Sequence, residues 1–134
     1  MNRTIVALVG TVLLVSGAAV SAHHSYAGFA DNTVSVEGHL EKVMFANPHV
    51  MLTIRAKDGS AYTAVWVAAF TLENRGTKAT DFKIGDVIVV RGTPAKDPAV
   101  HEIARLSEVR RVSDGWRWLQ NDSGRGPTIT TATK

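Results

Sequence analysis

Two adjacent histidines follow an apolar leader, at the point where an exported protein would begin after processing. Arg3, an apolar run and small residues before the join at Ala22 and His23 form the parts of a signal peptide. Cleavage after Ala22 makes His23 the first residue, and its α-amino group and ring nitrogen can then chelate one metal ion together. Cleavage after Ser21 makes His24 the third residue, where an amine, two amide nitrogens and an imidazole suit square-planar copper(II) or nickel(II). Both cleavage positions predict a metal-binding terminus.

The available ligand types favour copper. The chain has five histidines and no cysteine, so it can form neither a disulfide nor a thiolate metal site. Imidazole binds copper, nickel and zinc, and copper(II) stands at the top of the divalent affinity series. The predicted metal ligands are His23, His24, His49 and His101. Because the terminal amine must lose a proton to bind metal, we expect affinity to fall as pH falls.

The internal histidines also have purely structural interpretations. His49 follows the turn Asn47-Pro48 and would then only fix that turn through a hydrogen bond. His101 stands beside Glu102, which either orients it as a ligand or shares with it the polar start of a strand. His39 alternates with polar residues and is predicted to be exposed.

Methionines offer a softer set of donors. Met44 and Met51 could bind copper(I), and Met51 is predicted to share the face of His49. Methionines on strands more often serve packing.

A second hypothesis rests on aromatic residues. Tyr62 and Trp66 are predicted to share one face of a strand, where they could bind a small ligand, a glycan or a partner protein. Alternatively, both rings cover the barrel core beneath the helix or beneath the segment Trp116-Arg117-Trp118.

The hydrophobic pattern predicts a small barrel that positions these residues. Apolar residues alternate in several short segments separated by turn residues, and the phase slips between Leu40 and Val43, near Gly38. The predicted strands are 33–40, 49–56, 61–67, 87–92 and 101–112, with one short helix at 68–75. This is the element order of a five-stranded, OB-like Greek-key barrel, so the fold class is all-β with one short helix. In that fold, ligands bind near strands two and three and the loops that carry His49 and His101.

Composition and patterning divide the chain into four segments. The predicted organisation is a signal peptide at 1–22, a mature N-terminal arm at 23–32, the OB-like domain at 33–119 and an unfolded tail at 120–134. Without the leader, the remaining length suits one domain.

Several short motifs carry a resemblance. They are Ala22-His23-His24-Ser25, Asn47-Pro48-His49, Trp66, Lys83-Ile84-Gly85-Asp86 and Gly92-Thr93-Pro94-Ala95. With these motifs the chain resembles a family of small exported bacterial proteins that carry a domain of unknown function. The resemblance implies export and a small β-domain, and it implies no activity.

Other function classes find little support in the sequence. The 15 basic residues face 12 acidic ones, a balance too even for a nucleic-acid surface. No catalytic motif is recognisable, so we expect no enzymatic activity. The sequence therefore predicts a periplasmic or secreted protein that binds a transition metal ion, copper first. The alternative is a periplasmic adaptor that holds a small ligand or a partner protein. Neither nucleic-acid binding nor stable membrane insertion after cleavage is expected.

Overall fold

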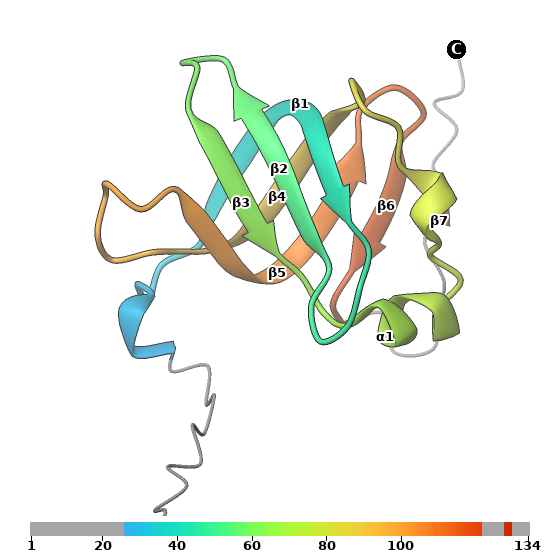
Figure 1. Cartoon of the computed structure of the whole chain (residues 1–134), viewed down its shortest axis with the longest axis horizontal. Coiled ribbons are helices and arrows are strands. Elements are labelled where there is room, and N and C mark those ends of the chain that lie inside the picture. Colours follow the sequence, from blue (N-terminus) through green and yellow to red (C-terminus); the bar gives the residue numbers. More distant parts are fainter. Residues whose placement is uncertain (1–25, 122–127, 130–134) are drawn as a thin grey trace, which may run out of the picture.

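Five strands close a small barrel with one short helix beside it (Figure 1). The computed structural model describes residues 26–121 and 128–129. The barrel strands are β1 (Val34–Met44), β2 (Met51–Ala56), β3 (Ala61–Val65), β4 (Val87–Pro94) and β5 (Glu102–Arg111). They neighbour one another in the order β3-β2-β1-β4-β5, and a parallel pairing of β3 with β5 closes the barrel. The predicted OB-like Greek-key fold is confirmed.

The helix between β3 and β4 is short, as predicted. Helix α1 (Ala69–Asn74) is closed by Gly76, two residues after its end, which has a φ of 80° and donates its N–H to the Glu73 carbonyl. Two 3₁₀ turns flank the barrel, η1 (Tyr26–Gly28) and η2 (Ala79–Asp81). Among residues 26–121 and 128–129, no helix has the length and apolar character needed to cross a membrane.

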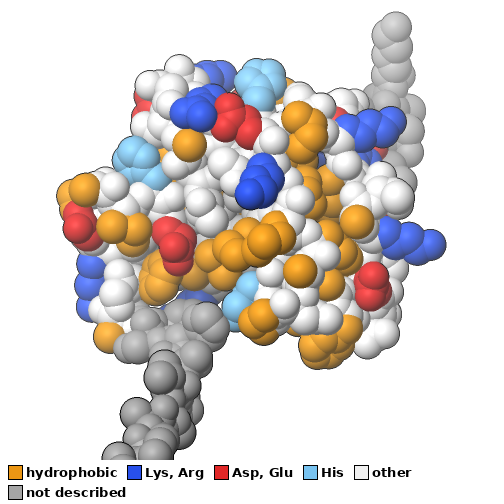
Figure 2. All heavy atoms as spheres, viewed as in Figure 1, with side chains coloured by type: hydrophobic (Ala, Val, Ile, Leu, Met, Phe, Trp, Pro, Cys, Tyr) orange, Lys and Arg blue, Asp and Glu red, His pale blue; other side chains and the backbone are white. Residues whose placement is uncertain are grey.

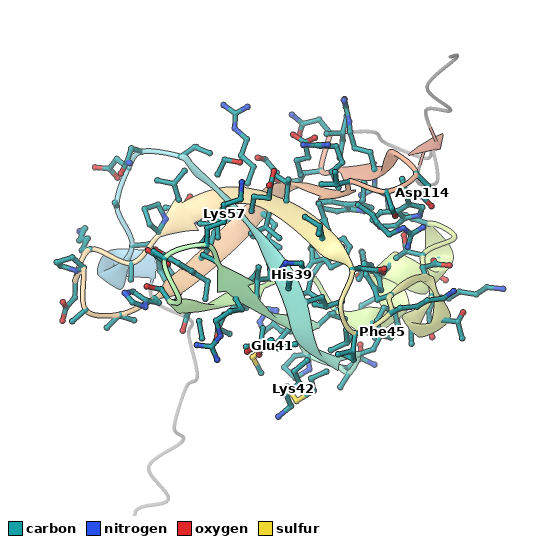
Figure 3. All side chains as sticks on the ribbon, turned by 90° about the horizontal axis from the view of Figure 1, so that it is seen from above. His39, Glu41, Lys42, Phe45, Lys57 and Asp114 are labelled. Carbon is teal, nitrogen blue, oxygen red and sulfur yellow. The ribbon has the colours of Figure 1, made fainter. Side chains whose placement is uncertain are left out.

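Alternation along β1 and β2 fills the core as the sequence pattern indicates. Leu52 and Ile54 on β2 are completely buried, as is Val50 just before the strand. On β1, the side chains of Ser35, Glu37 and His39 are exposed, so the prediction for His39 is confirmed. Figure 3 places His39 on the outer face of β1.

Strand β1 bends so that it serves both sides of the barrel. Its first half pairs with β4 and its second half with β2, and Gly38 pairs with both Ala56 and Ile88. The register with β2 shifts between Leu40 and Lys42. A bulge with Glu41 as its extra residue therefore causes the phase slip seen in the sequence, and Gly38 permits the close approach of β2 just before it.

The chain beyond the fifth strand contributes more than predicted. Strand β6 (Trp116–Leu119) adds to β5, and β7 (Thr128–Ile129) adds to β6. Residues 128–129 fall within the predicted tail 120–134, and their backbone pairs with β6. Trp116 and Trp118 are buried in the core, where they meet Phe82 and Trp66 edge-on.

A charged pair fixes the turn between β5 and β6. Arg111 donates from Nε and Nη2 to the two Asp114 carboxylate oxygens, at 2.9 and 2.6 Å. The hydrogen bond from Arg111 lowers the pKa of Asp114, and the Trp116 N–H bond to the same carboxylate acts in the same direction.

We expect Asp114→Asn to lower the free energy of unfolding by no more than about 1 kcal/mol at pH 7, because the carboxylate is partly exposed. A lowered pKa stabilises the fold above the pKa of the unfolded chain, and this stabilisation is lost as pH falls through the folded value. The difference between parent and variant should therefore shrink below about pH 5. Urea unfolding from pH 7 to pH 2 measures it, and a difference that stays constant with pH would contradict the assignment.

Candidate functional site

A pocket opens where β3 and β5 separate. The two strands pair only at Thr63 with Glu102 and at Ala64 with Ile103. Beyond these pairs lies a pocket of about 350 Å³. Its apolar lining includes Phe29, Val65, Trp66, Val67, Ala104 and Leu106, and its polar lining is His49, Glu102, Arg105 and Gln120. Figure 2 shows hydrophobic side chains gathered across the face that carries β2, β3 and β5, with charged side chains around them.

A distortion of β5 forms one wall of this pocket. Arg105 has a φ of 48°, a left-handed conformation that costs a residue with a side chain of order 1 kcal/mol or more. The register with β4 shifts here, because Arg91 pairs with Glu108 while Thr93 pairs with Ala104. This bulge causes the irregular alternation of apolar residues in the predicted fifth strand. Bulges of this kind often redirect side chains next to functional sites.

His49 is held in the pocket by its own hydrogen bond. Its Nδ1 lies 2.9 Å from the carbonyl oxygen of Trp66. Because a carbonyl only accepts, Nδ1 carries the proton, and Nε2 has the lone pair whenever the ring is neutral. Histidines that bind metals usually have this arrangement, with one nitrogen donating to a carbonyl and the other facing the metal. The predicted turn-fixing hydrogen bond and a ligand role are thus compatible.

Backbone hydrogen bonds fix the loop that carries His49. The N–H of Val50 donates to the Val67 carbonyl at 3.0 Å, and the N–H of Trp66 donates to the Val50 carbonyl at 2.8 Å. These two backbone hydrogen bonds flank the contact of His49 with the Trp66 carbonyl, and they attach the loop between β1 and β2 to the chain just after β3.

The N-terminal arm leads to the same pocket. Phe29 forms an isolated bridge with Ala95 and lines the pocket. On either side of it, Ala30 donates its N–H to the Pro94 carbonyl and Gly28 accepts from the Lys96 N–H. The predicted ligands His23 and His24, like the signal peptide at 1–22, lie outside the described residues.

His101 lies in different surroundings from His49. It is exposed and stacks on Tyr62, with ring centroids 4.9 Å apart and planes 24° from parallel. It does not line the pocket, although its neighbour Glu102 does. Within residues 26–121 and 128–129, no three histidine, aspartate or glutamate side chains group closely enough to hold a metal ion. Any metal site that uses His49 therefore needs other donors.

The two predicted aromatic binding residues, Tyr62 and Trp66, line different hollows of the surface. Trp66 is 2% exposed, and its ring meets Trp118 and Phe82 edge-on at centroid distances of 5.0 and 5.9 Å. Trp66 thus forms part of the core and only a margin of the pocket wall. Tyr62 borders a separate shallow depression next to Glu37. The two rings line different hollows, but both also pack at the core, Trp66 within it and Tyr62 as a half-buried neighbour.

Sequence reasoning missed most of the pocket lining, including Phe29, Arg105 and Gln120. Phe29 lies in a segment with no periodicity, and Gln120 lies past the last predicted strand. Arg105 had one usable signal, the broken alternation of the segment 101–112.

Comparison with known proteins identifies a family and no activity. The model of a family described as "Family of unknown function (DUF6152)" matches residues 10–104, more than two thirds of the chain. No curated protein matches the chain.

Proposed function

The chain belongs to this family of unknown function, and we propose that it is an exported copper-binding barrel. The processed N-terminus and His49 together hold copper(II) at the β3–β5 pocket. His23 supplies its amine and imidazole, His24 adds a further nitrogen, and His49 supplies Nε2. The observation that carries the proposal is the Nδ1 contact of His49 with the Trp66 carbonyl, which orients the ring and assigns the lone pair of the neutral imidazole to Nε2.

The position of the arm supports this set of donors. Phe29 fixes the arm at the pocket that His49 also lines. His23 precedes Phe29 by six residues, and a segment of that length spans at most about 20 Å when extended. The terminal amine is therefore tethered within reach of His49. Glu102 adds a carboxylate to the same pocket, which favours a cation.

His101 has no part in this proposal. Its ring stacks on Tyr62, outside the pocket lining, and so it competes for copper only as a separate surface histidine.

Titration with copper(II) tests the proposal on mature protein whose N-terminus has been fixed by intact mass. We expect one-to-one binding in the parent protein. Three extra glycines before His23 remove the chelate ring and also keep both histidines out of the third position, so they should weaken binding by about two orders of magnitude or more. His49→Ala should weaken it by at least about tenfold. Affinity should also fall from pH 8 to pH 6, because protons compete for the amine and imidazole nitrogens.

Two surface histidines serve as matched controls. His39→Ala and His101→Ala each remove one exposed imidazole, and both should leave the affinity unchanged. If the glycine extension binds copper(II) as tightly as the parent protein, the terminal chelate is wrong. If His39→Ala weakens binding as much as His49→Ala, the pocket is not the site.

The pocket itself favours a second candidate function. Its mixed lining and volume suit a small organic ligand, which would bind against Phe29 and the margin of Trp66. In this alternative the protein is a periplasmic binding module or an adaptor that holds a partner protein, and metal binding has no role in it. It becomes the leading candidate if the parent protein fails to bind copper(II), and a ligand screen by thermal shift would then test it.

A further inference from the structure

Two methionines lie directly opposite each other at the end of the barrel. Met44 of β1 pairs in register with Met51 of β2, and Met51 in turn pairs with Val65 of β3. Directly opposed residues in an antiparallel pair have their Cβ atoms roughly 4.5–5.5 Å apart and on the same face. Two flexible thioether side chains can therefore reach a common point.

Both side chains point away from the core. The preceding pair, Val43 with Leu52, faces inward, since Leu52 is completely buried and Val43 packs against the core. Strict alternation from Leu40 would have placed Met44 inside with it. The bulge between Leu40 and Lys42 shifts the phase by one residue and turns Met44 outward.

Packing does not account for this pair. Met44 is 38% exposed and Met51 is half-buried. In the described part of the chain, neither belongs to the hydrophobic core cluster, nor to the half-buried side chains that pack against it. Cross-strand contact alone would be served as well by leucine or valine.

The register connects the methionine pair with the pocket that His49 lines. Met51 is two residues beyond His49, and its cross-strand partner Val65 lines the same pocket as His49. The row Met44, Met51 and Val65 thus runs across the outer face to the pocket margin.

We propose that Met44 and Met51 form a copper(I) site with Nε2 of His49. Thioether sulfur is a soft donor that selects copper(I) over harder divalent ions, and imidazole completes a neutral set of three ligands. Lys42 lies one outward pair away, opposite Thr53, and Figure 3 shows it extending from the end of β1. A cation beside neutral ligands favours the monovalent ion over the divalent one.

This site shares His49 with the proposed copper(II) site but does not use the terminal amine. The two proposals can therefore fail separately. Titration of the mature protein with copper(I) under anaerobic conditions, in competition with bicinchoninate, measures the affinity. Met44→Leu and Met51→Leu keep size and apolar character while removing sulfur.

We expect each single leucine variant to weaken copper(I) binding by about tenfold or more, and the double variant to lose competition with the chelator. Copper(II) binding should stay unchanged in the double variant. The glycine extension before His23 should leave copper(I) binding unchanged, and His49→Ala should weaken both.

A direct readout comes from silver(I), a closed-shell stand-in for copper(I). The chain has three methionines, of which Met1 lies in the predicted leader, so only Met44 and Met51 contribute methionine ε-methyl resonances to the mature protein. Both should shift together at one equivalent of silver(I). Wild-type copper(I) affinity in the double variant, or methyl resonances that do not move, would overturn the site. So would loss of copper(I) binding on glycine extension, because it would assign the ion to the terminus.

Discussion

Replacing Gly38 with alanine should lower the free energy of unfolding by at least about 3 kcal/mol, the upper end of the cost of overpacking a core. A Cβ at this position would lie 2.2 Å from the carbonyl oxygen of Arg55 and 2.8 Å from Cγ2 of Ile54. The obstacle is mainly backbone, so no side-chain rotation relieves it. β1 and β2 would have to separate at the bend where β1 serves both halves of the barrel.

Urea unfolding at pH 7, followed by tryptophan fluorescence, measures this loss. Gly28→Ala is the matched control, because nothing lies within 4 Å of a Cβ there. We expect that control to change the free energy of unfolding by no more than about 0.5 kcal/mol. Equal effects of the two substitutions would show that β1 and β2 do not approach so closely at Gly38.

Replacing Trp66 with alanine should cost about 3–5 kcal/mol of stability, the range found when large aromatic residues are removed from a core. Trp66 is almost fully buried, and its ring contacts both Trp118 and Phe82. The loss should appear in both thermal and urea unfolding. It follows from a core role and would not follow if Trp66 were an exposed platform for ligands.

Trp66→Phe separates packing from polar contacts. The indole N–H of Trp66 is buried without a hydrogen-bond partner in residues 26–121 and 128–129, so phenylalanine removes no bond there. We expect this variant to cost clearly less than the alanine variant, because the phenyl ring keeps part of the buried contacts and leaves a smaller cavity. Copper(II) affinity should also survive, because His49 bonds to the backbone carbonyl of Trp66 and not to its ring. A Phe variant as unstable as the Ala variant would contradict this account.

The two copper proposals share one structural element, the loop between β1 and β2. His49 stands in this loop, Met44 ends the strand before it and Met51 begins the strand after it. Hydrogen bonds from Val50 and Trp66 fix the loop to β3. A rigid loop positions donors without the entropic cost of ordering it on metal binding.

The sequence by itself determined the barrel. Strict alternation of apolar residues assigned the inward side of β2, and turn residues such as Asp58-Gly59 marked the hairpin that follows it. The order of five strands, with one helix after the third, then predicted an OB-like fold. These features follow from local spacing, because apolar and polar side chains alternate every residue along a half-buried strand. Two short strands escaped this logic, since β6 and β7 have too few residues to show a period.

The candidate site was only partly predictable. His49 was identified from its place after Asn47-Pro48. Its grouping with His101 depended on the relative positions of two loops, which the sequence does not give. The tertiary structure put His49 against the end of β3 and His101 on Tyr62. Which residues meet across a barrel depends on register and bulges, and these are set by pairing partners far apart in the chain.

Met44 shows this limit most clearly. Its position in the sequence, four residues after Leu40, places it inside the barrel if the strand is regular. The extra residue Glu41 turns the Met44 side chain to the outer face and brings it opposite Met51. The sequence therefore determined which donor types the protein carries, and the tertiary structure alone decided which of them face one another, because a one-residue shift in register moves every following side chain to the other face.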